Sequence, residues 1–147
     1  MRSNMFITIE GIEGSGKSTL LGIIRNFLAQ NDIDFCATRE PGGTKIAEKV
    51  RQILLEDHDE ALHPDTELFL MFSSRIQHIH QVVLPNLDQG RVVISDRFVD
   101  ASYAYQGAGR QVGFEPIDMI CNQFIPKGAL PNMTFFMKAP IELCLER

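Results

Sequence analysis

The chain has 147 residues, of which 44% are hydrophobic and 22% are charged. These proportions are typical of a folded globular domain and exclude a wholly disordered chain. The 19 acidic residues outnumber the 14 basic ones and give a net charge of −5, which argues against binding nucleic acid or an anionic membrane through overall charge. Apolar runs reach only about five residues, against the ~18 that a membrane span needs. We therefore predict a single soluble domain over 1–147, cytoplasmic by default.

Strand-like and helix-like segments alternate along the chain. Apolar runs rich in β-branched residues predict strands at 5–9, 34–38, 92–94 and 134–137. Helical spacing predicts helices at 19–30, from the N-cap Thr44 onwards, at 65–88 with a kink at Pro85 and an end at Gly90, after residue 97, at 115–124 and from Pro140 onwards, with a glycine-rich loop at 107–113. This alternation predicts an α/β fold with three layers, in which helices cover both faces of a mainly parallel sheet. Ligands of such sheets bind at the carboxyl ends of the strands.

The most specific motif follows the first predicted strand. Residues 11–18 read Gly-Ile-Glu-Gly-Ser-Gly-Lys-Ser and match the phosphate-binding P-loop of nucleotide triphosphatases. Its glycines let backbone N–H groups surround phosphate oxygens, its lysine neutralises charge, and the hydroxyl of Ser18 suits Mg²⁺. The alternative is a glycine-rich turn that only joins a strand to a helix. The expected triphosphate-binding residues are Gly11, Ile12, Glu13, Gly14, Ser15, Gly16, Lys17, Ser18 and Thr19.

Three weaker patterns accompany the P-loop. Asp96 ends a buried run and would hold Mg²⁺ beside the loop, unless it caps the next helix. Isolated arginines are suited to a second, anionic substrate, although surface arginines are the alternative; they are Arg39, Arg51, Arg75, Arg97 and Arg110. Side chains that could stack on a base, but are more typical of a core, are Phe69, Met71, Phe72, Tyr103 and Tyr105.

The histidines do not have the spacing of a metal site. His78 and His80 lie two residues apart on a predicted helix and so point to different sides. We interpret them as solvated, and we expect no zinc site. Residues 107–110 are too short for a dinucleotide fingerprint and are interpreted as a flexible turn.

Several segments in order resemble bacterial thymidylate kinases, a family of P-loop nucleoside monophosphate kinases. The resemblance runs from about Met5 to Arg147 and rests on 6–11 leading into the P-loop, Arg-Glu-Pro-Gly-Gly-Thr at 39–44, Leu-Met-Phe-Ser-Ser-Arg at 70–75, Asp-Arg-Phe at 96–98 and Tyr-Ala-Tyr-Gln-Gly at 103–107. It implies the reaction of ATP with dTMP to give ADP and dTDP, with Mg²⁺, in dTTP synthesis. It also implies a cytoplasmic homodimer that binds neither nucleic acid nor membranes.

The same resemblance assigns roles to individual residues. Lys17, Arg97 and Asp96 would be catalytic, and Ser18 and Asp96 would hold the metal. Arg75 would contact the thymine edge, Arg97 the dTMP phosphate and Tyr105 the deoxyribose. Whether Met71 or Phe72 lies under the base is left open. The expected dTMP-binding residues are Glu13, Arg39, Glu40, Pro41, Arg51, Met71, Phe72, Arg75, Arg97, Ser102, Tyr105 and Gln106.

The chain also departs from the family pattern. Positions 12–15 of the P-loop hold no arginine, which resembles the subtype that carries a catalytic arginine in a mobile lid. The lid, last strand and terminal helix of the family would follow 143–147, so we expect the chain to be an N-terminal portion of about two-thirds of a kinase. The alternative is a truncated or repurposed P-loop module that binds nucleotide without turnover.

Overall fold

Four parallel strands form the centre of the molecule. The computed structural model describes residues 4–146, with strands β1 Phe6–Glu10, β2 Phe35–Arg39, β3 Val92–Asp96 and β4 Met133–Phe136. Their order in the sheet is β2-β3-β1-β4, and each pair of neighbours is parallel. The predicted parallel α/β sheet is confirmed.

The register brings the chain's polar segments to one edge of the sheet. Asp96 at the end of β3 lies opposite Ile9 of β1 and Arg39 of β2. Glu10, the last residue of β1, lies opposite Phe136 of β4. The phosphate loop, the 39–44 loop and the segment after Asp96 therefore all begin at the same edge, where ligands of parallel sheets bind.

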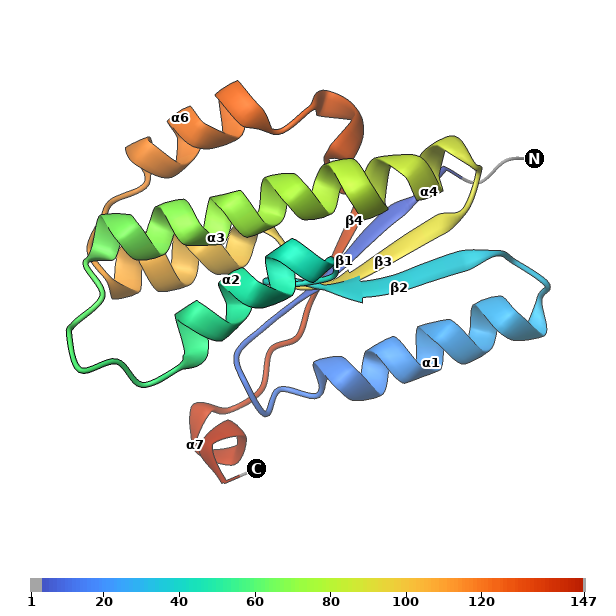
Figure 1. The fold of residues 1–147 in the computed structure, drawn as a ribbon. Helices are drawn as coiled ribbons and strands as arrows, with labels where there is room; N and C mark the ends of the chain where they lie inside the picture. Colours follow the sequence, from blue (N-terminus) through green and yellow to red (C-terminus); the bar gives the residue numbers. More distant parts are fainter. Residues whose placement is uncertain (1–3, 147) are drawn as a thin grey trace.

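Helices cover both faces of the sheet (Figure 1). Helix α1 Lys17–Gln30 lies on one face, and the opposite face carries α2 Lys45–Leu55, α3 Pro64–His78 and α6 Glu115–Phe124. Two apolar clusters match this division: Ile7, Ile9 and Ile94 pack with Leu28 of α1, whereas Phe6 and Val93 pack with residues of α3 and α6. The alternation of β1 and β3 residues between two cores confirms the three-layer prediction. The shorter helices are α5 Val99–Ser102, η3 Lys127–Ala129 and α7 Ile141–Leu145.

The long predicted helix at 65–88 consists of three consecutive helical segments. After α3 the chain continues as a π-helical stretch, η1 Ile79–Val83, and then as α4 Leu84–Asp88. The wider turns immediately precede Pro85, whose ring cannot donate a backbone hydrogen bond, and π-turns are a common cause of helix kinks. Gly90 ends the helix at φ 79°, with the amide of Arg91 bonded back to the Asn86 carbonyl. Within 4–146, every helix is too short or too polar to cross a bilayer.

The glycine-rich loop expected at 107–113 is wrong for residues 107–109. These residues belong to a second π-helical stretch, η2 Tyr103–Gly109. A Cβ at Gly107 would lie 2.8 Å from the ring of Phe114, so the glycine lets that ring pack directly on the helix. Only 110–113 remains a loop, and it is tied back by the amide of Gly113 on the Gly107 carbonyl. The glycine at 107, which suggested a flexible loop, in fact allows close packing within a helix.

Candidate active site

The phosphate loop joins the end of β1 to the start of α1. Gly11, Gly14 and Gly16 have positive φ values of 145°, 74° and 95°, which L side chains rarely adopt. A Cβ at Gly11 would also lie 2.7 Å from the Met137 carbonyl oxygen. Gly16 is the N-cap of α1 and supplies no side chain to cap it, so the first N–H groups of this helix can bind an anion.

Lys17 lies inside the curve of this loop. Only 8% of the residue is exposed, and its Nζ donates to the Ile12 carbonyl at 2.8 Å. Burial lowers the pKa of Lys17, the charge of Arg97 lowers it further, and the nearby carboxylate of Asp96 opposes both effects. Of the three residues predicted to be catalytic, Arg97 and Asp96 therefore lie close enough for their charges to act on Lys17.

Arg97 is held in an unusual backbone conformation. Its φ is 73°, and such strain in a residue other than glycine persists only where neighbours enforce it. Its N–H donates to the Ile9 carbonyl at 3.0 Å, its carbonyl accepts from Ser95 Oγ at 2.8 Å, and the next amide, that of Phe98, donates to Glu10 Oε1 at 2.6 Å. These bonds fix the turn on both sides of the arginine.

The guanidinium of Arg97 contacts Tyr105, a second residue expected to bind dTMP. Its Nη1 donates to the Tyr105 hydroxyl at 3.1 Å, and its central carbon lies 5.1 Å from the centre of the Tyr105 ring. Tyr105 is 46% exposed. The pair leaves the cation on the surface beside the phosphate loop, where it can reach a phosphate.

Asp96 and Ser18 have the chemistry of ligands for Mg²⁺. Asp96 Oδ1 is buried and has no hydrogen-bond partner within the described chain, which costs free energy unless a further group binds there. Carboxylate and hydroxyl oxygens are the ligands that Mg²⁺ prefers, and Ser18 lies exposed in the first turn of α1. No group of three His, Cys, Asp or Glu suited to a metal occurs in 4–146. The residues present therefore fit an ion whose remaining ligands are water or substrate oxygens.

The 39–44 loop is fixed by bonds to α2. Arg39 pairs with Glu48 Oε2 at 2.9 Å, and Glu48 Oε1 accepts from the Gly43 amide at 2.9 Å. The Gly43 amide and the charge of Arg39 lower the pKa of Glu48. Arg51 donates to the Pro41 carbonyl at 3.0 Å, after a cis peptide bond between Glu40 and Pro41. Arg39 and Arg51 thus stabilise the loop as well as adding positive charge to it.

Arg75 is buried beneath this loop. It is 1% exposed, and its guanidinium donates to Glu40 Oε2 at 2.6 Å, Ser102 Oγ at 3.0 Å and the Phe98 carbonyl at 2.9 Å. Among the described residues these bonds use three of its five N–H groups, so two could serve a ligand. Phe72 lies 4.7 Å from the guanidinium and is itself only 1% exposed.

Of the two residues considered for the base, the structure leaves Met71 the more accessible. Phe72 belongs to the core cluster, whereas Met71 is half-buried. Which of them contacts the base stays a prediction. Gln106 is buried, with Nε2 donating to Glu67 Oε1 at 2.8 Å and Oε1 unpaired within the described residues. Arg110 pairs with the other oxygen of Glu67 at 3.0 Å.

The interpretation of His78 as solvated is wrong. His78 is 0% exposed, and its two ring nitrogens bond to Glu40 Oε1 and Thr38 Oγ1, each at 2.8 Å. The sequence offered a usable signal, because His78 lies three residues after Arg75 and so shares its helix face. Glu10 was also missed as a neighbour of the site, although it is the last residue of a buried strand.

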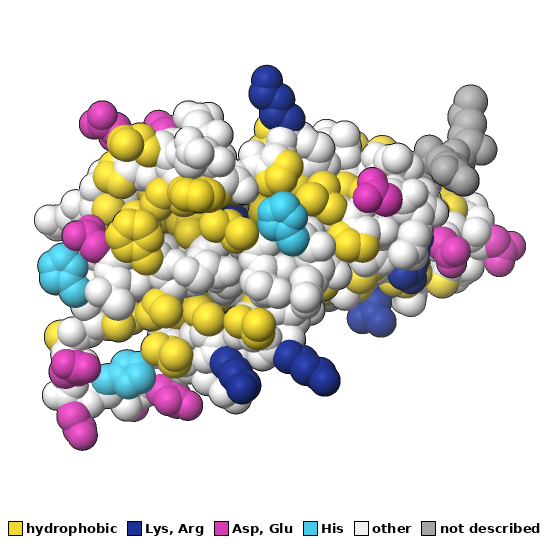
Figure 2. Space-filling model, turned by 45° about the horizontal axis from the view of Figure 1, so that its top comes forward, with side chains coloured by type: hydrophobic (Ala, Val, Ile, Leu, Met, Phe, Trp, Pro, Cys, Tyr) yellow, Lys and Arg dark blue, Asp and Glu magenta, His cyan; other side chains and the backbone are white. Residues whose placement is uncertain are grey.

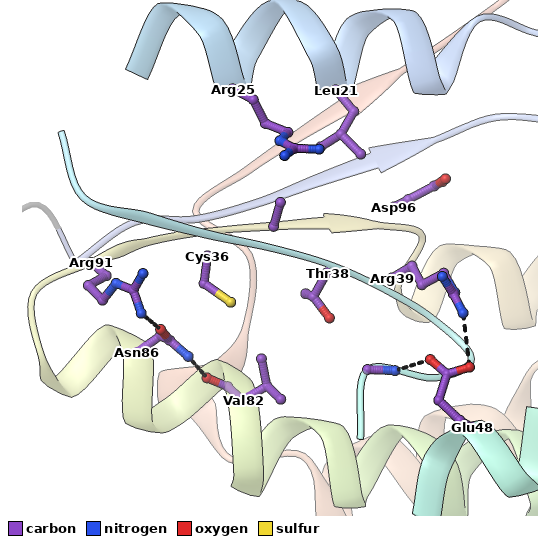
Figure 3. A pocket seen from close by; sticks show the side chains of 12 residues that line it. Leu21, Arg25, Cys36, Thr38, Arg39, Glu48, Val82, Asn86, Arg91 and Asp96 are labelled. Atoms are coloured by element: carbon purple, nitrogen blue, oxygen red, sulfur yellow. Dashed lines mark hydrogen bonds and ion pairs between the residues drawn. The ribbon is translucent and has the colours of Figure 1, made fainter. Parts of the chain in front are cut away.

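A cavity of about 560 Å³ lies beside the edge strand β2 (Figure 3). Arg25 and Leu21 of α1 approach it from one side of the strand, and Val82 and Asn86 approach it from the other. It reaches the candidate site through Arg39 and Asp96, but residues of the phosphate loop do not line it. The open edge of the sheet around 11–18 is therefore the better candidate for nucleotide binding.

A family model described as thymidylate kinase matches residues 9–147. The chain belongs to the thymidylate kinase family. A thymidylate kinase from Nitrosomonas europaea is 46% identical over 147 residues, which are 100% of this chain and 67% of the relative. One from Pseudomonas putida is 47% identical over 145 residues, which are 99% of this chain and 69% of the relative.

A solved structure supports the same assignment. The crystal structure of thymidylate kinase from Ehrlichia chaffeensis has a TM-score of 0.84 and 34% identity, over 97% of this chain and 80% of that one. Together these matches confirm the predicted family and its P-loop fold. They favour a thymidylate kinase over the alternative of a binding module without turnover.

Proposed function

We propose that the protein transfers the γ-phosphoryl group of ATP to dTMP, giving ADP and dTDP. The observation that carries this proposal is that two unlike cationic segments, each suited to a phosphate, meet at one edge of the sheet. One is the glycine-rich loop with Lys17, and the other is the turn of Arg97, whose amide bonds to Ile9 two residues before Gly11. Family membership supplies the identity of the two nucleotides.

The phosphate loop would bind the triphosphate. The N-terminal amides of α1 and the buried Lys17 offer positive charge to the β- and γ-phosphates, and burial of the ammonium strengthens that attraction. Phosphoryl transfer needs mainly positioning and charge stabilisation, since the protein takes little part in covalent chemistry. Lys17 and Arg97 would neutralise the charge that builds up on the transferring group.

The second nucleotide would lie over the 39–44 loop and η2. The guanidinium of Arg97 would bind the dTMP phosphate, Tyr105 would pack against the deoxyribose, and Arg75 would donate its remaining N–H groups to the thymine edge. The other residues that we assign to this site are Glu13, Glu40, Pro41, Arg39, Arg51, Met71 or Phe72, Ser102 and Gln106. The fixed loop supports this assignment, because a preorganised site loses less entropy on binding.

Mg²⁺ is the expected cofactor, with Ser18 and Asp96 as the residues that would hold it. When bound it would neutralise phosphate charge at the β- and γ-positions. The unpaired buried Oδ1 of Asp96 supports this role. A cytoplasmic location and a homodimer, both implied by the family resemblance, stay predictions.

The acceptor preference tests the proposal directly. The full-length protein is assayed for ADP release with ATP, Mg²⁺ and, in turn, dTMP, dUMP, AMP, CMP and GMP. We expect dTMP to give the highest kcat/KM. Efficient phosphorylation of another monophosphate, with no release of ADP on addition of dTMP, would refute the proposed substrate.

A further inference from the structure

A continuous chain of hydrogen bonds runs through the interior below the 39–44 loop. The two oxygens of the Glu40 carboxylate have different partners: Oε2 accepts from Arg75 Nε at 2.6 Å and Oε1 from His78 Nδ1 at 2.8 Å. The other ring nitrogen of His78 bonds to Thr38 Oγ1 at 2.8 Å. Glu40, Arg75 and His78 are 3%, 1% and 0% exposed, so water does not compete for these bonds.

The partners fix the orientation of the imidazole ring. A carboxylate only accepts hydrogen bonds, so Nδ1 of His78 carries a hydrogen and donates it to Glu40. A carboxylate that accepts from two buried donors is held in one rotamer, and it in turn aligns the guanidinium of Arg75. His78 thereby determines where Glu40 points, and Glu40 determines where Arg75 points.

Both ends of this chain reach segments assigned to the acceptor site. At one end Arg75 donates to the Phe98 carbonyl, one residue after Arg97. At the other end the ring of His78 supports the loop itself, because a Cβ added at Gly43 would lie 2.6 Å from its Cδ2 atom. The Gly42 amide adds a bond to Ser74 Oγ at 3.2 Å. The loop therefore rests on the imidazole ring.

We propose that His78 is a positioning residue for the acceptor nucleotide. Without touching the ligand, it holds the Glu40 carboxylate, and through it Arg75 and the 39–44 loop, in the geometry that binds the base and monophosphate. The inference rests on the proposed function, since it assumes that Arg75 and this loop meet dTMP. Its specific content is the bond from Nδ1 to Glu40, as opposed to the volume that the ring fills.

Two amide variants separate these contributions in the full-length protein. Asn carries its amide nitrogen near the position of ring Nδ1, so His78→Asn keeps a donor for Glu40. The amide nitrogen of Gln reaches the position of ring Nε2. His78→Gln therefore keeps a polar partner for Thr38 but loses the donor for Glu40. Because His78→Gln removes the buried bond that orients Glu40, we expect it to raise the KM for dTMP at least about tenfold.

For His78→Asn, which keeps the donor, we expect the KM for dTMP to rise less than about threefold. In both variants we expect the KM for ATP to stay within about twofold of wild type. Equal KM values for dTMP in the two variants, or equal rises for dTMP and ATP, would overturn the proposal.

Leu87→Ala is the control for lost stability alone, because Leu87 is buried in the core and lies outside the hydrogen-bonded chain. It should lower Tm and leave the KM for dTMP unchanged. Wild-type protein without dTMP-dependent turnover would instead refute the proposed function, and that assay comes first.

Discussion

At the scale of single residues, Arg97 carries the largest expected effect on acceptor binding. Three hydrogen bonds fix the turn around it, two of them made by its own backbone, whereas its guanidinium bonds only to the exposed Tyr105 among the described residues. We predict that Arg97→Ala raises the KM for dTMP and lowers kcat by about 10²-fold, as for other groups that stabilise transition-state charge. Steady-state kinetics measures both constants.

Arg97→Asn is the matched control for the backbone of this turn, because asparagine tolerates positive φ well. It should show the same kinetic loss as alanine, with better retained stability. Near-normal kinetics in either variant would show that the guanidinium is not needed.

Glu10 makes the stability of the protein depend on pH. Burial is the main cause that raises the pKa of Glu10 from 4.5 to about 7. The folded protein therefore keeps a proton that the unfolded chain releases, and stability falls as pH rises from 4.5 to about 7. Glu10→Gln removes this titration. Between pH 5 and pH 8 the free energy of unfolding of the wild type should therefore fall by up to about 3 kcal/mol more than that of the variant.

Urea unfolding of both proteins at the two pH values measures the difference. Glu60→Gln, at an exposed carboxyl, should behave as the wild type does. Parallel pH dependence in Glu10→Gln and wild type would contradict the buried titration.

The sequence singled out candidate ligand-binding residues, but it did not single out the residues that support them. The P-loop was readable because its spacing has a direct physical purpose, and Thr44 was readable as an N-cap that accepts from the Ala47 amide. The burial of His78 was not predicted, because it depends on a loop 35 to 40 positions earlier in the chain folding over the helix. Partners so distant in sequence leave no periodic pattern, and the one local signal was the helix face that His78 shares with Arg75.

At the scale of elements, η2 shows how close packing can require glycine within a helix. A Cβ at Gly107 would meet Phe114 at 2.8 Å and Ile117 at 3.2 Å, whereas one at Gly109 would have only an ordinary contact of 3.4 Å with the Ala104 carbonyl. We predict that Gly107→Ala destabilises the fold by about 1–3 kcal/mol through overpacking. Gly109→Ala should change stability much less. Equal midpoints of urea unfolding for the two variants would argue against this packing.

The order and type of the main elements followed from periodicity, and helix 115–124 was predicted with its observed bounds. Both π-helical stretches were missed. A π-turn differs from an α-turn by one residue, and its position is set by packing partners such as Phe114, so a pattern of apolar spacing does not reveal it. One of the two missed elements, η2, carries Tyr105 and Gln106.

At the scale of the whole molecule, part of the apolar surface of α2 is left uncovered. Ile46 and Ile53 remain 58% and 43% exposed, and Phe69 of the adjacent α3 is 61% exposed. Figure 2 shows apolar side chains gathered over these helices. Apolar patches of this kind typically mark interfaces, which supports the homodimer implied by the family.

We therefore predict a dimer in solution that Phe69→Glu converts to monomer. Light scattering after size exclusion measures the mass. Met119→Glu, at an exposed site on α6, is the control and should leave the dimer intact. A monomeric wild type would contradict the prediction.

The central claim is that the phosphate loop and the 39–44 loop with Arg97 act together on two nucleotides. Its most direct measurement is the rate of ADP formation by full-length wild type and Lys17→Ala, with ATP and Mg²⁺, in the presence and absence of dTMP. We predict that ADP formation by the wild type depends on dTMP and that Lys17→Ala lowers it at least about 10²-fold while dTMP still binds. ADP formation that is independent of dTMP, or equal rates in the two proteins, would contradict the account.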